Sequence, residues 1–172
     1  INASGATYAS GIRTGQTLTF NKGFSGTINS TLRGSNSSYW SHGVSGATII
    51  VNGDFGGVIN SKSTSNYGKV YAISGAMTVN GNFTSDIKSS SNYDNSYGTS
   101  GNLVINGDYT GTIQSLSNNS NSYGISGNID ISGNFSGSVK STGRYEIFAL
   151  NSSGDIAIGG DFTGTIEGSN TQ

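Results

Sequence analysis

The stretch Ser100–Ile125, SGNLVINGDYTGTIQSLSNNSNSYGI, contains one full unit of a repeat that runs through the chain. Six copies of its central part can be aligned, and each copy carries an aromatic residue at the same point. Successive aromatic residues are 31, 28, 26, 26 and 27 residues apart. A period in this range is typical of solenoids and other repeat arrays. We expect the six aromatic side chains to form one ladder in the core: Phe24, Phe55, Phe83, Tyr109, Phe135 and Phe162.

Apolar residues before each aromatic residue predict a strand with one buried face. The positions four and six residues before the aromatic residue are apolar in all six copies, and a period of two is that of a half-buried strand. The two columns are Phe20, Val51, Val79, Ile105, Ile131 and Ile158, and Leu18, Ile49, Met77, Leu103, Ile129 and Ile156.

A corner rich in Gly and Asn, such as Asn106-Gly107-Asp108, separates this strand from a second one. Gly and Asn tolerate the backbone angles that a sharp corner needs. The second strand has the pattern aromatic-x-Gly-x-Ile, as in Tyr109–Ile113, and we expect its glycine to leave room for the stacked rings. Gly111→Leu should therefore overfill the core. An Asn-Gly pair can also indicate an antiparallel hairpin, but like residues that recur in every copy favour parallel stacking.

Ser- and Asn-rich stretches of unequal length follow the second strand and are expected to be exposed loops. A short third strand, for example Tyr123-Gly124-Ile125, and a Ser-Gly corner then close the unit. The variable stretches are approximately Thr31–Tyr39, Lys62–Lys69, Ser90–Ser96, Leu116–Ser122 and Thr142–Glu146.

Together these elements predict an all-β fold, a right-handed three-sided parallel β-helix (β-solenoid) of about six rungs with ~26–31 residues each. Because the repeats run from end to end, residues 1–172 are expected to form a single domain. The rung is incomplete at both ends, which indicates a piece of a longer array.

The composition fits a thin core and argues against several classes of function. Hydrophobic residues make up 32% of the chain and charged residues 10%, so a thick globular core is not expected. With 8 basic and 9 acidic residues there is no basic surface for nucleic acid. No apolar run is long enough to enter a membrane. The absence of cysteine excludes disulfides and thiol chemistry and is typical of long secreted bacterial surface proteins.

The repeat resembles the β-helical passenger repeats of autotransporter and filamentous-haemagglutinin-like bacterial surface adhesins. The resemblance rests on NGDF-x-G-x-I at Asn52–Ile59 and NGDY-x-G-x-I at Asn106–Ile113. It implies a location on the bacterial cell surface or outside the cell, and use as a stalk, adhesive scaffold or fibre. The implied partners are a host or bacterial surface glycan or protein, or other copies in a fibre. No catalytic activity, cofactor or metal is expected.

Five aromatic residues in or beside the variable stretches are the candidates for contact with a partner or a glycan: Tyr39, Trp40, Tyr67, Tyr93 and Tyr145. Exposed aromatic rings can stack on sugars or anchor a protein partner. The same rings could instead fold over the base of the loops and shield the core.

Other polar positions leave alternatives open. The residue before each aromatic residue is Gly23, Asp54, Asn82, Asp108, Asn134 and Asp161. This column could bind calcium or cleave polysaccharide, but corner hydrogen bonding is the favoured interpretation. Asp130 and Asp155 are a weak candidate for a catalytic pair, and His42 is expected to pack in the column of Tyr71, Tyr97 and Tyr123. Carbohydrate binding or cleavage is thus the alternative function, and Thr-x-Thr rows on the second strand make ice binding a further one.

Overall fold

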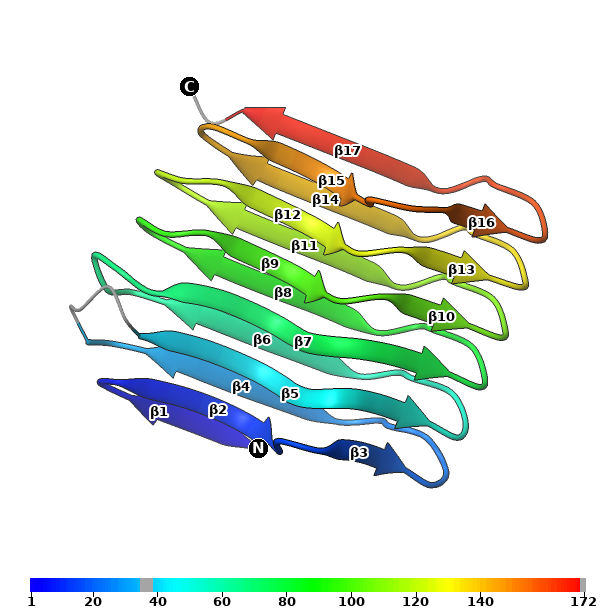
Figure 1. The fold of residues 1–172 in the computed structure, drawn as a ribbon, viewed down its shortest axis with the longest axis horizontal. Coiled ribbons are helices and arrows are strands. Elements are labelled where there is room, and N and C mark those ends of the chain that lie inside the picture. The colour runs from blue at the N-terminus through cyan, green and yellow to red at the C-terminus, as the bar shows by residue number, and fades with distance from the viewer. Residues whose placement is uncertain (35–38, 171–172) are drawn as a thin grey trace.

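The computed structural model describes residues 1–34 and 39–170, and in these residues it contains strands and no helix. The strands stack in parallel as a β-solenoid of about six turns, which confirms the predicted architecture. Figure 1 shows the strands running along the longest axis of the molecule, with successive turns stacked across that axis from the N-terminal to the C-terminal end. No helix in the described chain could span a membrane.

The first of two sheets, sheet A, contains the second strand of every turn. All its neighbours are parallel, and matching residues of successive repeats are paired, for example Ile113 with Ile87 and with Val139. In sheet order its strands are β1 (Asn2–Gly5), β4 (Thr27–Leu32), β6 (Val58–Ser63), β8 (Asp86–Ser91), β11 (Thr112–Ser117), β14 (Ser138–Gly143) and β17 (Thr165–Asn170).

The second sheet, sheet B, combines the predicted third and first strands. The two segments are one continuous strand in β5 and β7, and they separate at Gly101 and Gly127, which have positive φ, in the following turns. Three segments per turn therefore fall into two sheets. The strands are β2 (Tyr8–Arg13), β3 (Thr17–Phe20), β5 (Trp40–Val51), β7 (Lys69–Val79), β9 (Ser96–Ser100), β10 (Leu103–Ile105), β12 (Ser122–Ser126), β13 (Ile129–Ile131), β15 (Ile147–Asn151) and β16 (Ile156–Ile158).

The aromatic column lies where the chain passes from sheet B to sheet A. Each aromatic residue pairs with the next through a single parallel bridge, and their ring centroids are 4.6–5.5 Å apart. Phe55, Phe83 and Tyr109 are almost fully buried, whereas Phe162 in the last turn is half exposed. The buried Tyr109 hydroxyl donates to the carbonyl of Ser138 at 3.0 Å. Stacked rings at this separation stabilise each interface between turns.

A second feature of the core, buried serine, was not predicted. The inward positions of sheet A directly before the stretches expected to be loops are Ser30, Ser61, Ser89, Ser115 and Ser141, which are all buried. The hydroxyl groups of all but Ser141 bond to serines that face them from sheet B. Because each hydroxyl can donate and accept, paired serines satisfy one another away from water. Each of the strands β4, β6, β8, β11 and β14 also includes the first two residues of the stretch expected to be a loop, so the predicted loops began two residues too early.

The pairing between the sheets explains which serine lacks a partner. Ser96 donates to Ser89 at 2.8 Å, and Ser122 donates to Ser115 at 3.0 Å. In the next turn Ile147 replaces serine in sheet B, and the hydroxyl of Ser141 has no hydrogen-bond partner among the described residues. The polar part of the core thus depends on matched serines in the same turn.

We predict that Gly137→Ala destabilises the protein because a Cβ atom there would lie 2.3 Å from both Tyr109 Cε1 and the Gly111 carbonyl oxygen. Overfilling a packed core costs about 1–3 kcal/mol. The free energy of unfolding in urea measures this loss, and Gly111→Leu should lose more. Gly26→Ala is the matched control, since an added Cβ there has no neighbour within 4 Å. Equal stability of the Gly137 and Gly26 variants would contradict the packing described for the ring column.

Candidate functional site

The connections from sheet A to sheet B lie along one edge of the stack, which we call the loop edge. It consists of residues 64–68, 92–95, 118–121 and 144–146, together with Tyr39 and Arg33–Gly34 of the preceding connection. Residues 35–38 of the expected first loop lie outside the described residues. All five aromatic candidates lie on this edge or beside it.

Four of the five candidate rings are exposed. The exposed fraction is 42% for Trp40, 53% for Tyr67, 52% for Tyr93 and 65% for Tyr145, while Tyr39 is half-buried. The Trp40 ring lies edge-on to the rings of Tyr8 and His42. The Arg144 guanidinium lies 5.6 Å from the centroid of the Tyr145 ring. The rings of Tyr67, Tyr93 and Tyr145 are therefore available to a partner rather than folded over the core.

Backbone and side-chain hydrogen bonds hold neighbouring loops against one another. The amide of Gly68 donates to the Asp94 carboxylate at 3.4 Å, and the amide of Val70 donates to the carbonyl of Asn95 at 3.0 Å. Tyr67 and Tyr93 consequently occupy neighbouring turns. At the corresponding place in the next turn, Asn119 donates to the Asn92 carbonyl at 2.9 Å.

Buried serines also fix the loops to the core. The Ser91 hydroxyl accepts a bond from the Asp94 amide at 3.1 Å, and the Ser117 hydroxyl donates to the Asp94 carbonyl at 2.9 Å. The Ser117 hydroxyl also accepts from the Ser120 amide at 3.0 Å. Such side-chain to backbone bonds give a loop a defined shape. The sequence does not mark these residues, because serine is equally common in the surrounding exposed stretches.

The Asp/Asn corner column forms a chain of hydrogen bonds between turns. In each turn the side-chain Oδ1 accepts a hydrogen bond from the backbone amide of the matching residue in the next turn, at 2.8–2.9 Å. The pairs, acceptor first, are Asp54 and Asn82, Asn82 and Asp108, Asp108 and Asn134, and Asn134 and Asp161. Asp and Asn serve equally because only an oxygen acceptor is needed. No group of three or more His, Asp or Glu side chains that could hold a metal ion occurs within residues 1–34 and 39–170.

A second aromatic column lies on sheet B and begins with His42. The His42 ring stacks on Tyr71 at 5.3 Å, Tyr71 on Tyr97 at 4.7 Å, and Tyr97 on Tyr123 at 4.8 Å. His42 is buried and its Nδ1 has no hydrogen-bond partner among the described residues. Burial, assisted by the Arg13 charge, lowers the pKa of His42 to about 4, and burial raises the pKa of Tyr71 to about 12. His42 therefore packs as a neutral ring.

The two carboxylates considered as a catalytic pair, Asp130 and Asp155, lie on or beside sheet B. Asp130 is on β13, in register with Ala157 of β16, and Asp155 precedes β16. Both side chains are exposed and belong to neighbouring turns at positions offset by two residues.

Comparison with protein-family models, with curated proteins and with solved structures finds no match to this chain.

We predict that Asp108→Ala lowers the free energy of unfolding by about 1 kcal/mol, because the amide of Asn134 loses its acceptor. Asp108→Asn should match the wild type, since Asn82 and Asn134 perform the same role in other turns. Urea unfolding with and without calcium measures both effects. An increase in wild-type stability on adding calcium that Asp108→Asn abolishes would instead support a calcium ladder.

We also predict that stability falls as the pH drops from about 6.5 to about 4. Over this range the unfolded chain binds a proton at His42 while the folded chain, with its pKa lowered to about 4, does not. The loss attributable to His42 is up to about 3 kcal/mol. Comparing the free energy of unfolding in urea of the wild type and His42→Phe at pH 7 and pH 4 isolates the contribution of His42 to this loss. An identical pH dependence in the two proteins would exclude it.

Proposed function

We propose that this chain is a structural scaffold of a bacterial cell-surface or extracellular fibre protein, a stalk or adhesive segment, and not an enzyme. The observation that supports this proposal is that the same inward columns repeat from turn to turn through the described residues. Repeated parallel stacking gives a stiff body whose length grows with the number of turns.

The loop edge is the surface that we assign to partners. It combines the variable part of each repeat with exposed aromatic rings, and large exposed aromatic side chains are the usual anchors of binding surfaces. Serine hydroxyls hold the loops in place, so a partner meets a surface that is already ordered. A surface glycan or a surface protein are the partners that such rings suit.

The other candidate functions have less support. Cleavage of a polysaccharide needs two carboxyl groups that face one bond, and Asp130 and Asp155 are exposed in neighbouring turns at positions offset by two residues. Ice binding needs regular rows of hydroxyl groups, and the row from Thr27 to Thr165 is interrupted by Val58 and Asp86.

We predict that Tyr67→Ala/Tyr93→Ala lowers binding to cell surfaces or to an array of surface glycans at least about tenfold, because two exposed rings are removed. The free energy of unfolding of this double variant in urea should equal that of the wild type. Thr84→Ala/Thr110→Ala, at the opposite corner edge, is the matched control and should bind as the wild type does. Binding that both double variants retain in full would contradict the assignment of the loop edge.

A further inference from the structure

The outer face of sheet A carries a column of long polar side chains that the proposed function does not use. The pairing of sheet A aligns the residue after each inward Ile or Val through successive turns. Every member can donate or accept hydrogen bonds. The column reads Asn2, Asn29, Asn60, Lys88, Gln114, Lys140 and Glu167.

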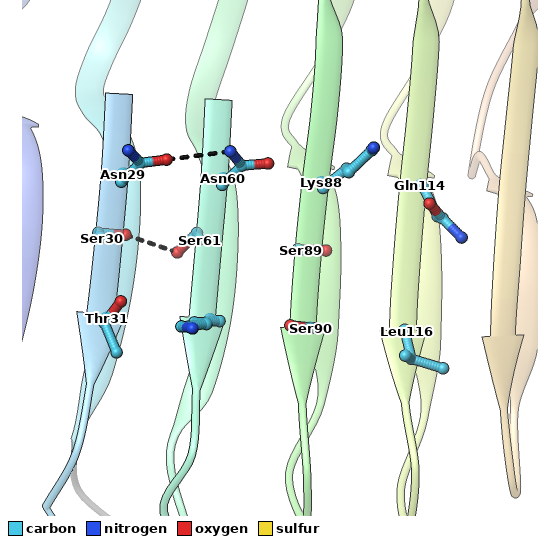
Figure 2. Close-up of a pocket in the computed structure, with 11 residues that line it drawn as sticks. Asn29, Ser30, Thr31, Asn60, Ser61, Lys88, Ser89, Ser90, Gln114 and Leu116 are labelled. Carbon is cyan, nitrogen blue, oxygen red and sulfur yellow. Dashed lines mark hydrogen bonds between the residues drawn. The ribbon is translucent and has the colours of Figure 1, made fainter. Parts of the chain in front are cut away.

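A pocket of about 420 Å³ lies over the middle of this column, on strands β4, β6, β8 and β11. Figure 2 shows Asn29, Asn60, Lys88 and Gln114 side by side on four neighbouring strands. A second row, two residues further along each strand, adds Thr31, Lys62, Ser90 and Leu116 to the lining. The pocket therefore extends across the strands, along the direction in which the turns stack.

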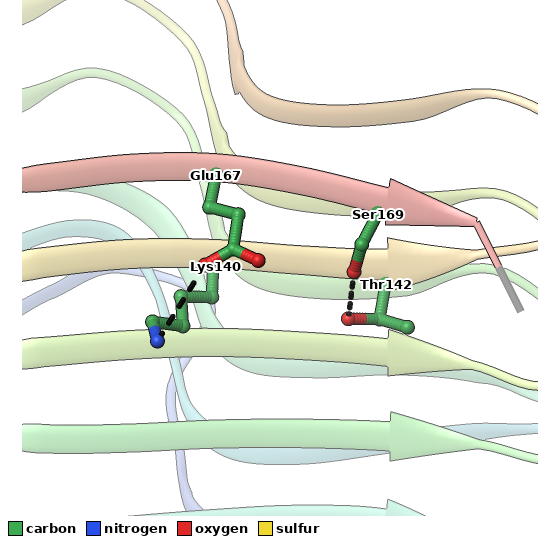
Figure 3. A network of polar contacts seen from close by, with 4 residues as sticks. All are labelled: Lys140, Thr142, Glu167 and Ser169. Carbon is green, nitrogen blue, oxygen red and sulfur yellow. Dashed lines mark hydrogen bonds and ion pairs between the residues drawn. The ribbon is translucent and has the colours of Figure 1, made fainter.

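Two lysines give this pocket a positive charge. Lys62 and Lys88 are exposed, and neither forms an ion pair with any residue that the structure describes. The acid on these four strands is Asp86, two residues before Lys88 and outside the pocket lining. Lys140 lies in the same column but outside the pocket, and its Nζ forms an ion pair with Oε2 of Glu167 at 3.6 Å. Figure 3 shows these two side chains. Within the pocket lining, Lys62 and Lys88 therefore carry a positive charge that no acidic residue of the lining neutralises.

The amide groups of the pocket are held in fixed positions. Asn29 donates to Asn2 at 2.8 Å, and Asn60 donates to Asn29 at 2.9 Å. Each side-chain amide has two N–H donors, and this ladder uses one of them. A second donor on each amide remains for a ligand, and its position is set before binding, which reduces the entropy cost of binding.

We propose that this pocket binds an acidic polysaccharide laid across the strands of sheet A. The two ammonium groups match carboxylate or sulfate groups, and the amides and hydroxyls match sugar hydroxyls. A linear chain along the stack would meet a similar donor at each turn. An acidic protein segment is a poorer match, because Leu116 is the one apolar side chain in the lining and protein partners need buried apolar anchors. This surface is separate from the loop edge.

The test measures binding to immobilised alginate, a polyuronate, with neutral dextran and poly-glutamate as comparison ligands. Wild-type protein should bind alginate at low ionic strength, should lose that binding as salt screens the charges, and should not bind dextran. Lys62→Gln/Lys88→Gln should bind alginate at least about tenfold more weakly. The control Lys140→Gln removes one lysine from the same column outside the pocket and should bind as the wild type does.

Several results would overturn the proposal: no alginate binding by the wild type, equal binding by the double lysine variant, or binding of poly-glutamate as tight as that of alginate. A lower sedimentation mass of the free double variant would show that the face joins two copies, and would also overturn it. Tyr67→Ala/Tyr93→Ala separates the two proposals. If this variant loses alginate binding while the lysine variant keeps it, the loop edge binds the polymer and the sheet A proposal fails.

Discussion

The contact between one turn and the next, in strict register, is the constraint on which the rest of the structure depends. Backbone hydrogen bonds in both sheets join residues that are about one repeat apart, and the ring column adds a stacked aromatic pair at each step. Any change in register would move Phe55, Phe83 and Tyr109 off one another and would separate the hydroxyl groups that pair inside the core. Side chains that match their own copies one turn away are therefore favoured at every inward position.

The core divides into a part held by apolar packing and a part held by hydrogen bonds. Near the corner, aliphatic and aromatic columns fill the space between the sheets. Towards the loop edge the filling changes to serine, and Ser89 and Ser115 bond to serines of sheet B. Where serines of the two sheets face one another in the same turn, their hydroxyl groups satisfy each other's hydrogen bonds away from water. Serines at this end of the core, such as Ser117, also form hydrogen bonds to the backbone of the loops.

The arrangement of residues on the outer surface also results from the stacking of matching residues in successive turns. Because every outward residue has counterparts above and below it, a single polar substitution becomes part of a column. Asparagine columns bond along their length, as in Asn60 to Asn29, and the corner column links turns through backbone amides. Where two neighbouring columns carry Lys62 and Lys88, positive charge collects at one place on the outer face of sheet A. Position in the stack, more than residue type, therefore decides which surface could recognise a ligand.

The sequence by itself determined the repeat, the parallel stacking, the inward aliphatic and aromatic columns and the glycines that pack against the rings of Phe83, Tyr109 and Phe135, because these depend on spacing and on side-chain volume. It also placed His42 in its column. Only the tertiary structure decided that two strand segments share sheet B, that serines such as Ser89 point inward, and that Lys62 and Lys88 lie at one pocket. Those features depend on the distance between the sheets and on which turn faces which, and a serine or lysine has the same appearance in a sequence whether it is paired, buried or free.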